Sequence, residues 1–430
     1  MKDMNRIIIV GNGFDLAHGL KTKYEDFINW YWDKWGQRLR SCGVKSISDG
    51  LCSFVLKDEV GLAGWYLVWS YHYRILPFKL TNRQLIDLVI TDDDVCDFKM
   101  HSVFLNEICK SIETKGWVDI EADYYRMLVE CKGDKEEVER LNKDFAVIQD
   151  LLVEYLDEIQ KQKINEELVC EEIKNAIQGP VLKRDMAVSS IGEWWGFVEE
   201  RLKAEDTELT MILAPYVDAQ YMHIVRKDIQ DFANKNYERI IVHGEEPLRL
   251  PDYFLVPDRV MLLNFNYTKT ADLYLPKSTG FICNHIHGNL LVPETVIFGY
   301  GDESDDEYKT LQKFNDNEYL RHIKTNRYLE TPNYRDLLSF IDSAPFQVCI
   351  MGHSCGLSDK TLLNTVFEHK NCVSIKPYYY VNEQGKDNYL DIVQNISRNF
   401  TNPQLMRDRV VNKTYCEELP QVTRKQKDEE

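Results

Sequence analysis

The chain opens with a short run of β-branched residues that ends in a glycine turn. Ile7–Val10 is typical of a strand buried on both faces, and Gly11–Gly13 interrupts it. The stretch Tyr24–Trp35 then predicts a helix, because its apolar residues recur three and four positions apart. A strand, a tight turn and a helix in this order indicate the first βα unit of an α/β sheet.

Helical periodicity replaces the strand signal between about residue 40 and residue 235. The clearest case is Lys135–Lys163, where apolar residues share one face and Glu and Lys fill the other. Strand-like runs return from residue 236, and Ser358–His369 follows one of them as a predicted helix. The strands predicted in this second half are Arg239–Val242, Val260–Asn264, Phe281–Ile286, Val296–Phe298 and Val348–Met351.

This order of elements predicts a Rossmann-like α/β fold, with one parallel sheet domain that a large helical insertion splits in the sequence. The predicted sheet domain comprises residues 1–38 and 236–400, and the mostly helical insertion comprises residues 39–235. Residues 401–430 become polar and charged, which predicts a short helix and a charged C-terminal tail.

The composition argues against several classes of partner. Lys and Arg total 52 and Asp and Glu total 70, so the formal charge is −18. A chain with this charge has no overall positive potential that would attract duplex nucleic acid or an anionic membrane. No apolar run approaches the length of a membrane span or a signal-peptide core. Eleven cysteines without a CxxC pair disfavour a disulfide framework. We therefore expect a cytoplasmic protein with no membrane partner.

The glycine turn is a candidate phosphate-binding site. Glycine lets the backbone approach a pyrophosphate closely, and the N-terminus of the following helix supplies free N–H groups. Asp15 and His18 project from the same turn, where polar groups can face a ribose. The alternative is a tight turn without a ligand, and Leu16 in place of the third glycine of G-x-G-x-x-G disfavours a conventional dehydrogenase. The candidate nucleotide-binding residues here are Gly11, Asn12, Gly13, Phe14 and His18.

Polar clusters also follow three of the later predicted strands. They are Asn264–Thr268, His285–Asn289 and Gly352–Asp359. Ligands of open α/β sheets bind outside the carboxyl ends of the strands, so we expect these clusters and the glycine turn to meet at one crevice. The alternatives are turn-forming roles for Asn264 and Asn266, and a helix cap at Ser358.

Two further readings of these clusters involve metal and nucleophilic chemistry. His285 and His287 lie two apart on a predicted strand and would point to the same side, as a metal-binding pair does. No Asp or Glu lies close in sequence to complete such a site, so no metal is expected. A serine nucleophile at Ser354 is a third alternative, because His353-Ser354 follows a glycine as in a nucleophile elbow.

Four segments together match the motifs of a known family. They are GNGFDLAHGLKTKYEDF at the start of the chain, then NFNYT, HIHGN and GHS followed by SD. In this order they resemble the motifs of the AbiH family of bacterial abortive-infection proteins. Lys21 departs from the family pattern, which usually has proline after Gly-Leu. The resemblance implies a role in antiphage defence.

The same segments are similar, more distantly, to the sirtuin pattern. The glycines of the first segment match its nucleotide-binding glycines, Asn266 matches its catalytic asparagine, and His287 in Ile-His-Gly matches its catalytic histidine. Thr268 stands where sirtuins have an acid, and the zinc-binding cysteine pairs are missing, so deacetylation is not implied. The sirtuin-like domains of phage-defence proteins instead consume NAD, and this is the activity that the resemblance implies.

The resemblance assigns roles to residues of the predicted pocket. Gly11 and Gly13 would hold the phosphates of NAD, while Asn266, His287 and Asp15 would be catalytic: Asn266 positioning ribose and water, His287 acting as general base, and Asp15 stabilising developing charge. The residues expected to contact the nucleotide from the late segment are Gly352, Ser354 and Asp359.

The predicted function is thus an antiphage protein that binds and hydrolyses NAD. One alternative is a non-catalytic nucleotide-binding sensor or scaffold, and a second is a metal-dependent nuclease or phosphohydrolase using His285 and His287. The helical insertion is the expected place for homo-oligomerisation or for sensing a phage-derived trigger, and its alternative role is a lid over the pocket.

Overall fold

A computed structural model of the chain describes residues 3–40, 46–57, 80–91, 96–115, 119–131, 133–245, 250–277 and 279–422. Residues 423–430 of the predicted charged tail lie outside this described part. The chain divides into two compact units. Unit 1 comprises Met1–Leu20, Gln160–Ile297 and Thr325–Glu430, and unit 2 comprises Lys21–Ile159 and Phe298–Lys324.

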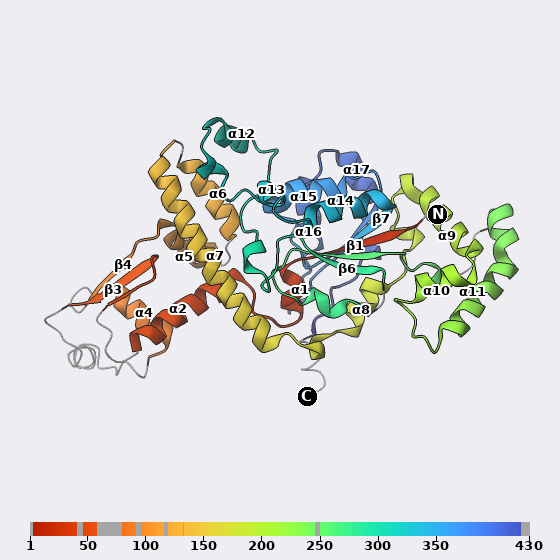
Figure 1. Cartoon of the computed structure of the whole chain (residues 1–430), viewed down its shortest axis with the longest axis horizontal. Coiled ribbons are helices and arrows are strands. Elements are labelled where there is room, and N and C mark those ends of the chain that lie inside the picture. Colours follow the sequence, from red (N-terminus) through yellow and green to blue (C-terminus); the bar gives the residue numbers. More distant parts are fainter. Residues whose placement is uncertain are drawn as a thin grey trace. The chain divides into compact units, whose positions relative to one another are not determined.

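Unit 1 is built around a parallel sheet of five strands in the described part of the chain. The spatial order is β6-β5-β1-β7-β8, so the first strand lies at the centre, and Figure 1 shows β1 beside strands from the far end of the sequence. This arrangement confirms the predicted Rossmann-like α/β fold. The strands are β1 (Asn5–Val10), β5 (Val260–Asn264), β6 (Phe281–His285), β7 (Phe346–Met351) and β8 (Cys372–Tyr378).

Alternate side chains of β1 belong to two different hydrophobic layers. Ile7 and Ile9 pack with helices on one face of the sheet, and Ile8 and Val10 pack with helices on the other. All six residues of β1 are buried, which explains why its part Ile7–Val10 is a continuous β-branched run without polar alternation. The helices are α14 (Asn333–Ser343), α15 (Lys360–Phe367) and α16 (Tyr389–Arg398) on the first face, and α1 (Asn12–Ala17) and α8 (Glu171–Gln178) on the second.

The strand order reverses beside β1. After β1 the chain forms β5 and β6 on one side, and it then returns to form β7 and β8 on the other. The carboxyl ends of β1 and β7 therefore flank the point of reversal, which is where open parallel sheets bind their ligands.

The predicted strand Arg239–Val242 is wrong, because this segment is helical. α11 (Met222–Tyr237) continues into a π-helix, Glu238–Val242, and the His243 N–H donates to the Glu238 carbonyl. Ile240 packs into a helical core instead of a sheet. A short apolar run fits a buried helix turn as well as a strand, so periodicity could not separate the two.

The predicted strand Val296–Phe298 is also wrong. The segment is buried but irregular, and the Ile297 N–H donates to the carbonyl of His287, in the loop after β6. The short turn Pro293–Thr295 precedes it and Gly299, with φ +155°, follows it, so there is too little extended chain for a strand.

β8 is a strand that the sequence pattern did not reveal. Lys376 interrupts its apolar run, yet the Lys376 ammonium is buried, 3.1 Å from an Asp185 carboxylate oxygen and 2.9 Å from one of Glu417. Pro377 is tolerated because β8 is the edge strand of the sheet.

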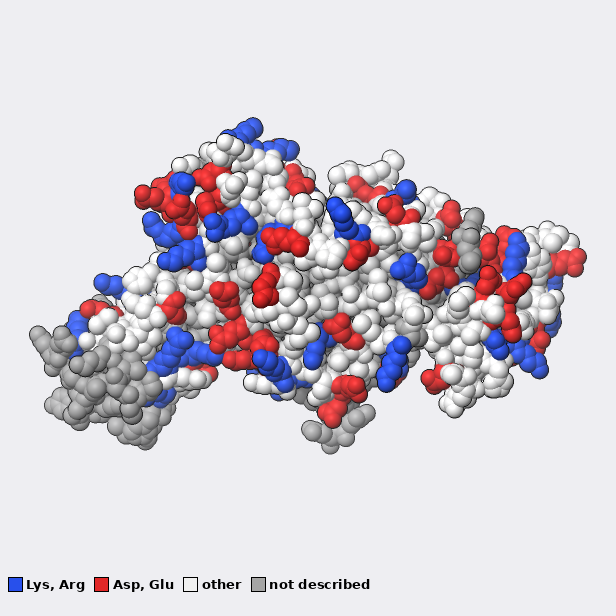
Figure 2. All heavy atoms as spheres, in the orientation of Figure 1, with Lys and Arg blue, Asp and Glu red and all other residues white. Residues whose placement is uncertain are grey.

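The other helices of unit 1 pack in part around a third apolar core. Its members come mainly from α9, α10 and α11 and from the segment before β5. None of the described helices is both long enough and apolar enough to cross a membrane. On the face drawn in Figure 2, acidic and basic side chains are interspersed. The helices of unit 1 that pack in part around this third core, besides α11, include α9 (Ile191–Lys203) and α10 (Asp206–Leu213). A further helix of unit 1, α17 (Pro403–Arg409), lies in the predicted tail.

Unit 2 is mostly helical and contains a small antiparallel sheet that the sequence pattern did not predict. The long helix α7 has the predicted bounds, Lys135–Lys163, because many amphipathic turns define it. The sheet has the order β2-β3-β4, with strands β2 (Ser46–Ser48), β3 (Cys52–Leu56) and β4 (Cys96–Met100). The remaining helices among the described residues of unit 2 are α2 (Tyr24–Arg40), α4 (Asn82–Thr91), α5 (Val103–Lys115), α6 (Ile120–Glu130) and α12 (Asp306–Lys313), and α13 (Lys324–Arg327) begins at the last residue of unit 2 and continues in unit 1.

Candidate functional site

The residues after β1, β5, β6 and β7 meet at one edge of the sheet. The side-chain amide of Asn266 donates to the carbonyl of Gly11 at 3.0 Å, which joins the ends of β5 and β1. The ring of Phe265 lies against His287 and His353, with centroids 5.0 and 4.3 Å away. The four segments singled out in the sequence are therefore neighbours in unit 1.

The glycine turn packs directly on the loop that follows β7. A Cβ on Gly11 would lie 2.6 Å from the Cα of His353, and one on Gly13 would lie 2.8 Å from the Cα of Gly352. The Gly13 N–H donates to the Gly352 carbonyl at 2.7 Å. Gly352 has φ +77°, and a Cβ there would lie 2.1 Å from the nitrogen of Phe14. Glycine is thus required here by backbone packing, and one N–H of the predicted phosphate cradle is used inside the protein.

Asp15 is a fully buried carboxyl beside this turn. It is 1% exposed, and its Oδ2 accepts a hydrogen bond of 2.7 Å from the hydroxyl of Thr268. Its Oδ1 has no hydrogen-bond partner among the described residues. Burial raises the pKa of Asp15 to about 6, and the hydrogen bond from Thr268 opposes this rise. Asp15 can therefore both donate and accept a proton near neutral pH.

Asp359 joins two histidines at the same edge. Its Oδ1 lies 3.3 Å from Nε2 of His287, and its Oδ2 lies 3.6 Å from Nε2 of His353. All three side chains are buried. Nδ1 of His353 accepts from the Cys355 N–H at 3.0 Å, so a neutral His353 ring carries its proton on Nε2, toward Asp359. The carboxylate is placed to orient His287 and to stabilise it when it takes up a proton.

Two of the predicted nucleotide-binding residues lie in the core. His18 donates from Nδ1 to the Phe14 carbonyl at 2.7 Å, and its Nε2 accepts from the Tyr274 hydroxyl at 2.6 Å. Burial lowers the pKa of His18, which keeps the ring neutral. Phe14 packs edge-on against Tyr274 in the same layer. Asn12 and Ser354, in contrast, are exposed at the surface.

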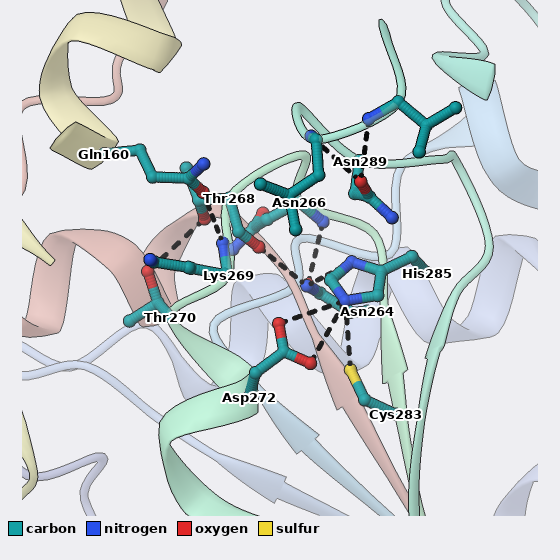
Figure 3. Close-up of polar contacts among 12 residues, drawn as sticks. Gln160, Asn264, Asn266, Thr268, Lys269, Thr270, Asp272, Cys283, His285 and Asn289 are labelled. Atoms are coloured by element: carbon teal, nitrogen blue, oxygen red, sulfur yellow. Dashed lines mark hydrogen bonds and ion pairs between the residues drawn. The ribbon is translucent and has the colours of Figure 1, made fainter. Parts of the chain in front are cut away.

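His285 and His287 have different partners. Nε2 of His285 lies 3.1 Å from Oδ2 of Asp272 and 3.5 Å from Sγ of Cys283, whereas His287 contacts Asp359 (Figure 3 shows the first cluster). β6 ends at His285, so the strand alternation that would align the two rings does not extend to His287.

Two residues that take part in these contacts could not be recognised from the sequence. Asp272 lies in a short turn, Ala271–Tyr274, and the Tyr328 hydroxyl lies 3.1 Å from Nε2 of His287. Neither directly follows a strand, and neither has a telling spacing to the histidines. Their positions depend on how distant segments pack.

Comparison with known proteins gives one clear relationship. No curated protein and no solved structure matches the chain significantly. A family model described as "Bacteriophage abortive infection AbiH" matches residues 7–380, which include β5, β6, β7 and β8, all of β1 except its first two residues, and every strand end described above. The chain therefore belongs to the AbiH family, whose place is in abortive infection as a defence against bacteriophage.

Proposed function

We propose that the chain acts in this defence by hydrolysing a nucleotide, with NAD as the expected substrate, at the carboxyl ends of β1, β5 and β7. The observation that carries the proposal is the position and state of Asp15. A carboxyl of pKa about 6, with one oxygen unpaired among the described residues, lies near Asn266 where the strand order reverses. Burying such a group destabilises the fold, and groups of this kind are concentrated at functional sites.

The proposed reaction converts NAD and water into nicotinamide and ADP-ribose. Breaking the nicotinamide–ribose bond develops positive charge at the anomeric carbon, comparable to glycoside cleavage. Ionised Asp15 would stabilise that charge, and Asn266 would orient a ribose hydroxyl or the attacking water through its amide. His287, oriented by Asp359, would take the proton from the water.

Access to the site sets a condition on the substrate. The Gly13–Gly352 hydrogen bond and the contact between Gly11 and His353 close the edge between β1 and β7. A dinucleotide therefore has to part these two loops or bind beside them. Thr268, which stands where the sirtuin pattern has an acid, favours a second candidate function, a sensor that binds a nucleotide without cleaving it.

The test is release of nicotinamide from NAD by the purified full chain, with and without lysate of phage-infected cells. We expect release by the wild type, and loss of release in Asp15→Asn and Asn266→Ala. The matched control is Asp342→Asn, which removes an exposed carboxylate of unit 1 and should leave the rate unchanged. Absence of release under every condition, or equal rates in wild type and Asp15→Asn, would reject hydrolysis, and NAD binding without release would support the sensor.

A further inference from the structure

Three side chains with metal-ligating atoms converge at the end of β6. Cys283 and His285 lie two apart on the strand and so share a face, and Asp272 reaches them from the turn Ala271–Tyr274. Nε2 of His285 lies 3.1 Å from Asp272 Oδ2 and 3.5 Å from Cys283 Sγ. One such atom from each residue lies within 4.8 Å of the others, and Figure 3 shows the three turned toward one another.

We propose that Asp272, Cys283 and His285 form a binding site for a divalent transition-metal ion, with Zn²⁺ as the first choice. Carboxylate, thiolate and imidazole are the ligand types that Zn²⁺ accepts, whereas Mg²⁺ and Ca²⁺ prefer oxygen alone. Three protein ligands leave a fourth tetrahedral position for water or another ligand. The side chains of Asp272 and His285 are 33% and 15% exposed, so an ion can enter from solvent.

Hydrogen bonds fix the tautomer of His285 in the metal-free chain. The Asn264 amide oxygen accepts from the Asn266 N–H at 3.0 Å, so its NH₂ group faces Nδ1 of His285 at 3.3 Å. Nδ1 is therefore the acceptor, and the neutral ring carries its proton on Nε2, directed at Asp272. Burial and the charge of Asp272 raise the pKa of Cys283 well above its usual value, so the thiol keeps its proton too.

Metal binding replaces these protons with the ion. The thiol of Cys283 loses its proton to solvent, and the imidazole proton of His285 moves from Nε2 to Nδ1, which frees the Nε2 electron pair for the metal. The positive charge of the ion stabilises the Cys283 thiolate, whereas burial and the charge of Asp272 disfavour the thiolate in the metal-free chain. A proton on Nδ1 ends the 3.3 Å hydrogen bond from Asn264, while the amide keeps its bonds to the Asn266 N–H and the Thr268 carbonyl. The ion thus replaces the hydrogen bonds from His285 and Cys283 to Asp272, and one further hydrogen bond, from Asn264, is lost.

The same contacts have a metal-free explanation. Asp272 can simply accept hydrogen bonds from Nε2–H of His285 and from the thiol of Cys283. The two explanations differ in their response to added metal. This test does not depend on the proposed function, because neither explanation requires NAD or catalysis.

The experiment uses the full chain, purified with a chelator, dialysed, and titrated with Zn²⁺ and separately with Co²⁺. We expect uptake of a single equivalent, a thiolate-to-cobalt charge-transfer absorption in the near ultraviolet, and affinity that rises with pH because a thiol proton is displaced. Cys283→Ser should abolish the charge-transfer absorption, and Asp272→Asn should weaken Zn²⁺ binding by at least about 10-fold. The matched control is His369→Gln, because His369 is 16% exposed and contacts Asp342 at 3.4 Å.

Folding is checked in the same samples by thermal unfolding. Zn²⁺ should raise the unfolding temperature of the wild type and of His369→Gln but not of Cys283→Ser, since a ligand stabilises only the state that binds it. If Cys283→Ser does not fold, Asp272→Asn decides, because Asp272 is partly exposed. No uptake by the wild type, or equal uptake and the same cobalt spectrum in all variants, would overturn the proposal. Failure of NAD cleavage would leave it standing.

Discussion

The hydroxyl of Thr268 donates a hydrogen bond to Oδ2 of Asp15 across 2.7 Å, and it thereby joins the segment after β5 to the turn after β1 inside the core. Both side chains are 1% exposed. The bond makes the state of Asp15 dependent on a residue that follows a different strand.

Replacing Thr268 by valine keeps the volume of the side chain and removes the donor. A buried carboxylate that loses a hydrogen bond is destabilised, so we expect the free energy of unfolding at pH 7 to fall by about 1–3 kcal/mol. Urea unfolding measures the difference. Thr365→Val is the control, because the Thr365 hydroxyl bonds to the Thr361 carbonyl of its own helix, and a loss as large as that of Thr268→Val would contradict the prediction.

Replacing Asp15 by asparagine should stabilise the protein at neutral pH. Its folded-state pKa of about 6 lies above the ordinary value of 3.8, so the folded chain binds more protons between these values and stability falls as pH rises through them. The loss amounts to roughly 3 kcal/mol above pH 6, and the amide avoids it while keeping an acceptor for Thr268. Urea unfolding at pH 4 and pH 7 tests this, and an Asp15→Asn protein less stable than wild type at pH 7 would show that the carboxylate is structural.

The rate of nicotinamide release should depend on the same carboxyl. If ionised Asp15 is the active form, kcat/KM rises with pH and levels off above about 6. Thr268→Val removes a hydrogen bond that lowers the pKa of Asp15, so the rising limb should move to higher pH. An unchanged pH profile of kcat/KM in this variant would show that the ionisation of Asp15 does not control the rate.

Replacing Gly352 by alanine tests the packing of the two loops. The position has φ +77°, and the new Cβ would lie 2.1 Å from the nitrogen of Phe14. Gly385 is a matched control, because it also has φ +77° and no described atom within 4 Å of its Cβ position. Gly385→Ala should lose about 1 kcal/mol through backbone strain alone, and Gly352→Ala should lose at least about 2 kcal/mol more. Equal losses would mean that the loops separate freely.

Local sequence patterns were sufficient to predict the helices and strands whose pattern repeats many times or whose apolar run has no polar interruption. Lys135–Lys163 repeats its amphipathic pattern over 29 residues, and its bounds were confirmed. The strand at Ile7–Val10 was confirmed as part of β1, because these four residues are continuously apolar. β8 could not be predicted in the same way, because the buried Lys376 ammonium forms an ion pair with Asp185, which lies 191 residues away in the sequence. The strand prediction for Arg239–Val242 was wrong, because a segment of four mostly apolar residues fits a helix end and a strand equally well.

The sequence by itself determined the α/β class, the family, and the polar segments that follow the strands, because these depend on local patterns and on motif order. Only the tertiary structure decided which polar groups face each other. His285 contacts Asp272 and His287 contacts Asp359, although the sequence suggested a His285–His287 pair. Side-chain partners are set by the crossing of segments that have no fixed spacing in the chain, and strand alternation ends where the strand ends. The chemistry of each histidine is therefore a property of the folded sheet edge, and no local pattern contains it.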